Sequence, residues 1–314
     1  MKFSSIIGHE NIKDKLSKIS MTPQSYMFYG PPSIGKRTIA YNLSRYILCS
    51  GTKDDDCRCK VCANFNDHPD FLSIGTTGKI LVADVDNLID YVSRAPLCSE
   101  TKVIVVDNVD VISIEAANRL LKTLEETSFI FFLITSKIKS VLPTVSSRCI
   151  KLQFEALSQD DIVNILWKRM GFDLPQARVI GWVGAGSSMD IFSCAGLYLK
   201  YRDLSFDFFP VMMGKDFLSV LDFVDKIPRP DLPIFIDMVI LTLTDMLILK
   251  YSMDTIINAD RREDLLKISG VSAKVMIVAL NCLTQVKIHS YLNINLNLAL
   301  KSSLIKVWNM FKAG

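Results

Sequence analysis

The chain has 314 residues, of which 49% are hydrophobic and 22% charged, a length that suggests two or three domains with sizeable buried cores. A net charge of +3 is too small to indicate DNA binding by this chain alone. The longest apolar stretch, residues 232–249, is interrupted by Asp237 and Asp245, which argues against a membrane span. Nothing near the N-terminus resembles a signal peptide, so we expect a multidomain, mostly helical protein of the cytoplasm.

The first motif is a glycine-rich stretch at residues 30–38. An apolar run typical of a strand precedes it at residues 25–29, and apolar residues at helical spacing follow it. Strand, glycine turn and helix are the context of the phosphate-binding pattern G-x-x-x-x-G-K-[ST], in which backbone N–H groups and the lysine contact phosphates. We therefore predict a nucleotide-binding loop with contacts from Gly30, Pro31, Ser33, Gly35, Lys36, Arg37 and Thr38.

One position of this pattern is altered. Arg37 stands where the pattern has the hydroxyl that holds Mg²⁺, and a guanidinium group has only donors and cannot ligate a cation. Thr38 offers a hydroxyl one residue later, but a shift of one residue turns it by roughly 100° around a helix. We therefore expect the binding of ATP and Mg²⁺ to be weak or lost.

Four cysteines cluster in a polar segment after the first predicted helix. Cys49, Cys57, Cys59 and Cys62 have the spacing C-x₇-C-x-C-x₂-C, and four thiolates suffice for a tetrahedral structural Zn²⁺. Zinc is the first interpretation, reduced thiols without a metal are the second, and disulfides, which need an oxidising compartment, are the third. The other cysteines stand in apolar or helical surroundings and are predicted to be buried thiols: Cys98, Cys149, Cys194 and Cys282.

Two further strands are predicted to end at one ligand-binding edge. Residues 102–107 form a continuous apolar run that ends in Asp107, the position of a carboxylate that holds a metal ion through water. Asn108 follows where nucleotide-hydrolysing proteins of this kind usually have a glutamate base, and an amide cannot accept that proton. After a helix over residues 114–126, another apolar run ends at Thr135, a candidate phosphate sensor.

The second half of the chain is predicted to be helical. A short apolar stretch at residues 149–154 precedes a helix cap at residues 157–161, which opens a small helical unit that extends to about residue 202. From about residue 205 to the C-terminus, long segments of helical apolar periodicity contain no catalytic pattern. Such a unit is better suited to building an interface than to chemistry.

Several segments of the chain occur together, in the same order, in one known family. They are residues 7–10, 30–36, the cysteine cluster, 68–70, 102–107, 116–126, 142–144, 147–149 and, near the C-terminus, 293–300. With these segments the chain resembles the bacterial clamp-loader branch of the AAA+ proteins, and most of all the delta prime type of DNA polymerase III subunit, which is related to gamma/tau.

The resemblance implies an α/β AAA+ P-loop domain with a parallel sheet, followed by a small helical lid and an all-α C-terminal collar. The implied limits are residues 1–155 for the AAA+ domain, with a cysteine insertion at 49–62, residues 156–203 for the lid and residues 204–314 for the oligomerisation collar. The family has a sensor arginine in the lid where this chain has Met189. The family spacing of the cysteines, C-x₈-C-x₂-C-x₂-C, differs from this chain in the first two intervals.

The resemblance also implies a function. The motif at residues 147–149 presents Arg148 as an arginine finger to ATP bound by the adjacent subunit of a pentameric clamp loader. The chain would work with gamma/tau-like and delta-like partners to open the sliding clamp and place it on primed DNA. We expect little or no ATPase activity of its own, because Arg37, Asn108 and Met189 replace parts that act together in phosphoryl transfer. Two alternatives stay open: an active ATPase of the gamma/tau-like motor type, and a non-enzymatic zinc-containing scaffold.

Overall fold

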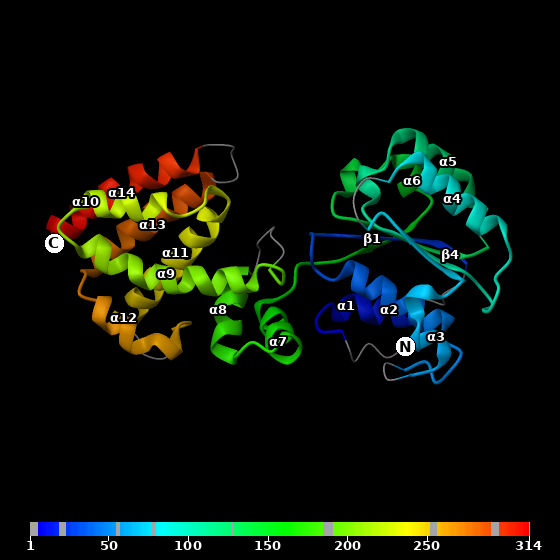
Figure 1. The fold of residues 1–314 in the computed structure, drawn as a ribbon, viewed down its shortest axis with the longest axis horizontal. Helices are drawn as coiled ribbons and strands as arrows, with labels where there is room; N and C mark the ends of the chain where they lie inside the picture. The colour runs from blue at the N-terminus through cyan, green and yellow to red at the C-terminus, as the bar shows by residue number, and fades with distance from the viewer. Residues whose placement is uncertain are drawn as a thin grey trace. The chain divides into compact units, whose positions relative to one another are not determined.

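The computed structural model describes residues 6–18, 23–54, 57–76, 80–126, 128–184, 191–251, 256–289 and 295–313. The chain divides into two compact units, Met1–Ser158 and Gln159–Gly314 (Figure 1). The first unit is built around a sheet, and the described residues of the second unit contain helices and no strand. Met189, the residue at the expected lid arginine, lies outside the described residues.

The first unit has a five-stranded parallel sheet with the strand order β2-β3-β4-β1-β5. Every residue of β3 and β4 is buried, as expected for continuous apolar runs in the middle of a parallel sheet. The expected α/β fold with a parallel sheet is therefore confirmed. The strands are β1 (Ser25–Tyr29), β2 (Phe71–Ile74), β3 (Val103–Val106), β4 (Ile130–Thr135) and β5 (Ile150–Gln153).

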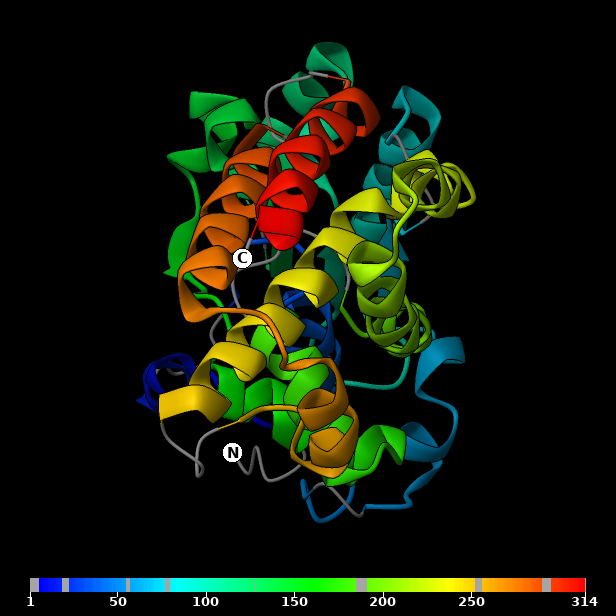
Figure 2. The ribbon, with the colours of Figure 1, turned by 90° about the vertical axis from the view of Figure 1, so that its left-hand side faces the viewer.

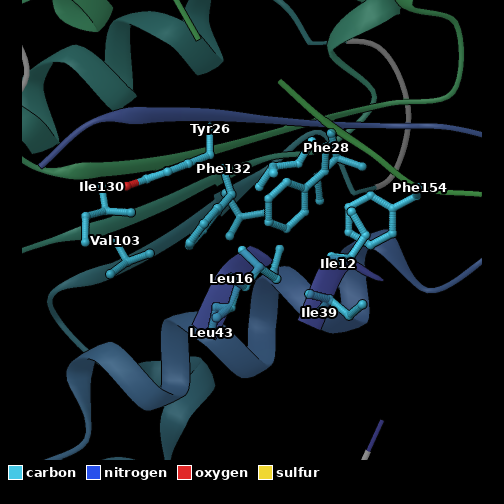
Figure 3. Packing of buried hydrophobic residues seen from close by; sticks show 14 of the residues in the cluster. Ile12, Leu16, Tyr26, Phe28, Ile39, Leu43, Val103, Ile130, Phe132 and Phe154 are labelled. Atoms are coloured by element: carbon cyan, nitrogen blue, oxygen red, sulfur yellow. The ribbon is translucent and has the colours of Figure 1, made fainter. Parts of the chain in front are cut away.

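Both faces of the sheet are covered by helices (Figure 1). Alternation along β1 directs Tyr26 and Phe28 to one face and Met27 to the other. Tyr26 and Phe28 pack on Phe132 and on side chains of α1 and α2 such as Leu16 (Figure 3). Met27 belongs to the core under α4 and α5. The helices are α1 (Glu10–Lys18), α2 (Lys36–Leu48), α3 (Lys60–Ala63), α4 (Val82–Ser93), α5 (Ile114–Glu125) and α6 (Pro143–Ser146).

The second unit packs around one long apolar helix, α11, which contacts α9 and α13 (Figure 2). The expected helical C-terminal region is confirmed. The expected limit between lid and collar, at residues 203 and 204, falls inside α9, and the division of this unit into a lid and a collar stays a prediction. The helices are α7 (Gln159–Met170), α8 (Leu174–Gly184), α9 (Ala195–Met213), α10 (Phe217–Asp225), α11 (Leu232–Tyr251), α12 (Arg262–Ile268), α13 (Ala273–His289) and α14 (Leu296–Ala313).

Among the described residues, one continuous helical segment, Arg229–Tyr251, is long and apolar enough to cross a membrane, and 61% of its apolar window is buried within the protein. The two aspartates of α11 (Leu232–Tyr251) have partners in the bundle. Asp245 accepts a hydrogen bond of 2.9 Å from the backbone N–H of Ile257, and Asp237 forms an ion pair of 2.6 Å with Lys287. Such burial and pairing are typical of the core helix of a helical bundle.

Asp70 ties the loop before β3 to the start of β2. Its carboxylate is fully buried and accepts hydrogen bonds of 2.7, 2.7 and 2.8 Å from the N–H groups of Leu97, Cys98 and Ser99. Burial raises the pKa of Asp70, but the three N–H groups lower it more, so the pKa lies below its ordinary value. The prediction that Cys98 is buried is wrong, because the loop held through its backbone leaves this side chain exposed.

We predict that Asp70→Asn lowers the free energy of unfolding by about 2 kcal/mol near neutral pH, because the amide turns an NH₂ group toward backbone donors. Asp70 has a depressed folded pKa, so its contribution is complete above the pKa of an unfolded aspartate, about 3.9, and is lost as the pH falls through the folded value. Denaturant unfolding should therefore show that acid below about pH 4 destabilises the unmodified protein more than the variant.

The control is Asp90→Asn, which removes an exposed carboxylate paired with Arg94 and should change stability by less than about 1 kcal/mol. An equal effect of the two substitutions would contradict the role given to Asp70.

Candidate functional site

The loop between β1 and α2 has the geometry of a phosphate-binding loop. At Gly30 an added Cβ would lie 2.2 Å from the carbonyl oxygen of Phe154, so only glycine fits. Gly35 is the N-cap of α2 and has a φ of +94°, a conformation that favours glycine. The His9 Nε2 atom lies 2.6 Å from the carbonyl oxygen of Ile34 and supports the loop from the N-terminal segment. The predicted strand, turn and helix are therefore present.

Lys36 is buried at the first residue of α2. Its Nζ donates to the carbonyl oxygens of Gly30, at 2.9 Å, and of Pro31, and lies 3.4 Å from the Ser136 Oγ. Burial lowers the pKa of Lys36 to about 8, although the negative charges of Asp107 and Asp110 raise it. The ammonium group thus lies against the loop, where a bound phosphate would compete with the two carbonyls for its protons.

Arg37 faces the carboxylate that the pattern assigns to the metal ion. Its Nη1 lies 3.9 Å from the Asp107 Oδ2, and its guanidinium carbon lies 5.3 Å from the centre of the Tyr41 ring. Burial raises the pKa of Asp107 and outweighs the backbone N–H of Asn108 and the positive charges of Arg37 and Lys36, which lower it. A guanidinium and an ammonium group offer no lone pair, so neither Arg37 nor Lys36 can ligate Mg²⁺.

Asn108 has a structural task at the end of β3. Its φ of +53° is left-handed, a conformation in which asparagine is common, and its Nδ2 donates to the carbonyl oxygen of Gly75 at 3.0 Å. Gly75 follows β2, and a Cβ there would lie 2.2 Å from the carbonyl oxygen of Asp107. The amide of Asn108 thus joins the ends of two neighbouring strands.

Thr135 ends β4 and is fully buried. Its hydroxyl donates to the Asp110 Oδ1 at 2.7 Å and accepts from the N–H of Lys137 at 3.0 Å. The next residue, Ser136, carries the hydroxyl nearest to Lys36. Phosphate contact by Thr135 stays a prediction, and sequence reasoning missed Asp110 and Ser136. Ser136 was detectable as the second polar residue at the strand end, whereas Asp110 had no signal in the sequence.

Two predicted contact residues lie on the outside of the loop. Ser33 is exposed and has a φ of +55°. Thr38 is exposed in the first turn of α2, and its carbonyl oxygen accepts a hydrogen bond of 2.9 Å from Asn42. Phosphate contact by Ser33 and Thr38 stays a prediction.

The four clustered cysteines come together where α2 ends. Their sulfur atoms all lie within 4.8 Å of one another, and the Cys49 Sγ is 3.6 Å from that of Cys57 and 3.8 Å from that of Cys59. Four sulfurs at about 2.3 Å from a tetrahedral metal ion lie about 3.8 Å apart, so these distances fit such an ion. They are longer than a disulfide bond of about 2.05 Å. The four cysteines, Cys49, Cys57, Cys59 and Cys62, can therefore hold a metal ion.

Local hydrogen bonds favour thiolates in this group. The N–H of Gly51 donates to the Cys49 Sγ at 3.4 Å. The backbone N–H of Cys62 is the largest cause that lowers the pKa of Cys59 to about 5, and the N–H of Cys59 lowers that of Cys57. Burial raises the pKa of Cys62. Thiolates are the form that binds metal ions.

Arg148 lies between α6 and β5, with 31% of its side chain exposed. Its Nε donates to the Glu125 Oε1 at 2.6 Å, its Nη2 pairs with the same oxygen, and its Nη1 donates to the carbonyl oxygen of Thr144 at 2.7 Å. Glu125 is the last residue of α5 and is half exposed. Arg148 therefore forms a local ion pair within this unit, and its contact with a neighbouring subunit stays a prediction.

Comparison with known proteins relates the first unit to a replication protein. Residues 9–158 match the family described as DNA polymerase III, delta subunit. DNA polymerase III subunit gamma of Buchnera aphidicola subsp. Schizaphis graminum is 29% identical over 202 residues, which cover 60% of this chain and 56% of that protein. DNA polymerase III subunit tau of Escherichia coli K12 is 30% identical over 170 residues, which cover 51% of this chain and 26% of that protein. The chain thus spans about a quarter to about half of the length of these relatives.

Solved structures resemble the chain more distantly. A protein of Thermotoga maritima related to the gamma subunit of DNA polymerase III has a TM-score of 0.41 and 18% identity, over 96% of this chain and 99% of that chain. The AAA domain of FIGL-1 in complex with ADP has a TM-score of 0.40 and 15% identity, over 63% of this chain and 72% of that chain.

The first unit has a phosphate-binding loop on a parallel sheet, and its sequence is similar to the DNA polymerase III delta subunit family. It is also similar in sequence to the gamma and tau subunits of DNA polymerase III. The delta prime type stays a prediction.

Proposed function

We propose that this chain is a delta prime-like subunit of a cytoplasmic DNA polymerase III clamp loader. It assembles with gamma/tau-like and delta-like AAA+ partners, and the complex opens the sliding clamp and places it on primed DNA. It donates Arg148 to ATP bound by a neighbouring subunit and has little or no ATPase activity of its own. The delta-subunit match over residues 9–158 and the gamma/tau relatives support membership of such a complex.

The observation that carries the proposed loss of ATPase activity is the pairing of Arg37 with Asp107 at 3.9 Å. The next residue, Asn108, is an amide engaged with Gly75 at 3.0 Å. Phosphoryl transfer depends on a metal ion, a residue that orients or deprotonates water, and nearby cations acting together. A loop that retains Lys36 while two of these positions are engaged in other contacts is better suited to holding a nucleotide than to hydrolysing it.

The contacts of Arg148 are compatible with donation to a neighbour. Glu125 and the Thr144 carbonyl hold the guanidinium group at the surface of the first unit. An exposed ion pair contributes only about 0.2–1 kcal/mol, so Arg148 can leave Glu125 when a more highly charged phosphate comes within reach. The planar fork of arginine suits contact with two phosphate oxygens.

We also infer that the four-cysteine group holds a structural zinc ion. Zn²⁺ prefers a tetrahedral set of thiolates, and four protein ligands leave no open position for a reaction. The ion would join the end of α2, through Cys49, to α3, which contains Cys62.

A gamma/tau-like motor subunit is the second candidate. The observation in its favour is that these relatives are named gamma and tau. The intact glycines of the loop and Lys36 are compatible with it, whereas Arg37 and Asn108 are not.

For the zinc site, the purified reduced protein should contain about one zinc ion per chain, because a structural zinc ion is bound as the protein folds. Cys59→Ser and Cys62→Ser should each lose the metal and lower the melting temperature. The control is Cys98→Ser, which changes an exposed thiol outside the group. This variant should keep the zinc ion and the melting temperature of the unmodified protein. Metal analysis that finds no stoichiometric zinc in protein prepared without chelator would reject the site.

For the nucleotide site, the isolated chain should release phosphate from ATP no faster than its Lys36→Ala variant. Arg37→Thr combined with Asn108→Glu should stay weakly active, since the lid arginine and a neighbour's arginine are still missing and the contact with Gly75 is lost. Robust hydrolysis by the unmodified chain that Lys36→Ala abolishes would favour the motor subunit instead.

For Arg148, the Arg148→Ala variant should assemble normally by gel filtration but lower the ATPase and clamp-loading rates of the whole complex, because a finger acts in the transition state of a neighbour's reaction. Fingers supplied in trans contribute about 10³ to 10⁵ in rate in small GTPases, and a complex with several catalytic interfaces should lose much less. Arg148→Lys should not restore the full rate, since an ammonium group cannot reproduce the planar fork.

The control for the local ion pair is Glu125→Gln, which removes its negative charge and leaves Arg148 in place. If Arg148 acts only through that pair, both substitutions should have equal effects on turnover. If Arg148→Ala leaves clamp loading at the unmodified rate, Arg148 is a surface charge and the finger hypothesis is wrong.

A further inference from the structure

In this phosphate-binding loop, the side chain of Arg37 approaches the carboxylate that normally holds the metal ion. The guanidinium group of Arg37 lies between the ring of Tyr41, at 5.3 Å, and the Asp107 carboxylate, at 3.9 Å. The Tyr41 hydroxyl donates to the Ser73 Oγ of β2 at 2.7 Å, which anchors the ring to the sheet. Tyr41 of α2 and Asp107 at the end of β3 therefore keep the positive charge of Arg37 close to the loop.

Both oxygens of the Asp107 carboxylate have neighbours within the protein. Its Oδ1 accepts the N–H of Asn108 at 2.9 Å, and its Oδ2 faces Arg37. A divalent cation placed here would also lie beside two positive groups, Lys36 and Arg37, and would find only donors on them. The side chains that would bind Mg²⁺ in the standard pattern are thus engaged in contacts within the protein.

The other parts of the loop suit phosphate. Gly35 caps α2 without a side-chain hydrogen bond, which leaves the N–H groups of the first turn to an anion. Lys36 adds an ammonium group next to the loop carbonyls. Arg37 is half exposed, and its pairing with Asp107 is longer than a hydrogen bond, so its planar fork is able to turn toward phosphate oxygens.

We propose that this loop binds a nucleoside diphosphate or triphosphate in its metal-free form, with Arg37 as the built-in cation that replaces Mg²⁺. This inference rests on the proposed nucleotide-binding role of the loop. It goes beyond that role because it says that Mg²⁺ weakens the binding of the nucleotide instead of strengthening it. Mg²⁺ competes with Arg37 for the same phosphate oxygens and is repelled by it. The metal complex of the nucleotide therefore binds more weakly than the free nucleotide.

The experiment is isothermal titration of the full chain with ADP and, separately, ATP, each in EDTA and in excess Mg²⁺. The unmodified chain should bind at least as tightly in EDTA as in Mg²⁺. Arg37→Thr should bind about 10- to 100-fold more weakly in EDTA, the effect of one charge-assisted hydrogen bond, and Mg²⁺ should restore its affinity through the new hydroxyl. Arg37→Lys should retain part of the metal-free binding, since it keeps the charge without the fork.

Two further variants separate the effect of Arg37 from that of other side chains on α2. Arg45→Ala removes an arginine from the last turn of the same helix and should leave both affinities unchanged. Thr38→Ala tests whether the exposed hydroxyl one residue after Arg37 holds a metal ion instead. Melting curves should show that all variants are folded.

Tighter binding of the unmodified chain in Mg²⁺, abolished by Thr38→Ala, would overturn the proposal and assign the metal to Thr38. Equal affinities of Arg37→Thr and the unmodified chain in EDTA, or no binding of either nucleotide under any condition, would overturn it as well. None of these results bears on the clamp-loader role, which is tested by turnover of the assembled complex with Arg148→Ala.

Discussion

The neighbour order of the parallel strands is the constraint on which the candidate site depends. β3, β4 and β1 lie side by side in the order β2-β3-β4-β1-β5, so their carboxyl ends bring Asp107, Thr135 and Gly30 to one edge of the sheet. That register is held by burial, because alternate residues of each strand pack into two separate cores, and a slip of one residue would exchange the two faces. The close approach of Gly30 to Phe154 then sets the path of the loop.

α2 connects the two candidate sites of the first unit. It begins at Lys36, beside the loop, and ends just before Cys49 of the cysteine group. Along its length Ile39 and Leu43 pack into the core beneath the sheet (Figure 3). The helix that carries the two positive residues of the loop is thus held by the sheet along its side and by the cysteine group at its end.

Much of this arrangement was open to prediction from the sequence. Continuous apolar runs at residues 102–107 and 129–134 correspond closely to the buried strands β3 and β4, because a strand covered on both faces needs no polar alternation. The cysteines are close along the chain, so their meeting was also predictable. The partners of Thr135 and Arg148 were not, since Asp110 and Glu125 belong to other elements and no periodicity relates them.

The sequence by itself determined the chemical groups that are present: a loop of glycines and lysine, Arg37 in place of a hydroxyl, Asn108 in place of a base, and four cysteines within one short segment. These depend only on residue identity and local spacing. The tertiary structure alone decided what each group contacts. Arg37 meets Asp107 only because the sheet brings the end of β3 beside α2, and Arg148 meets Glu125 only because α5 ends near the turn before β5. Such contacts arise from the packing of whole elements, which no local pattern in the chain encodes.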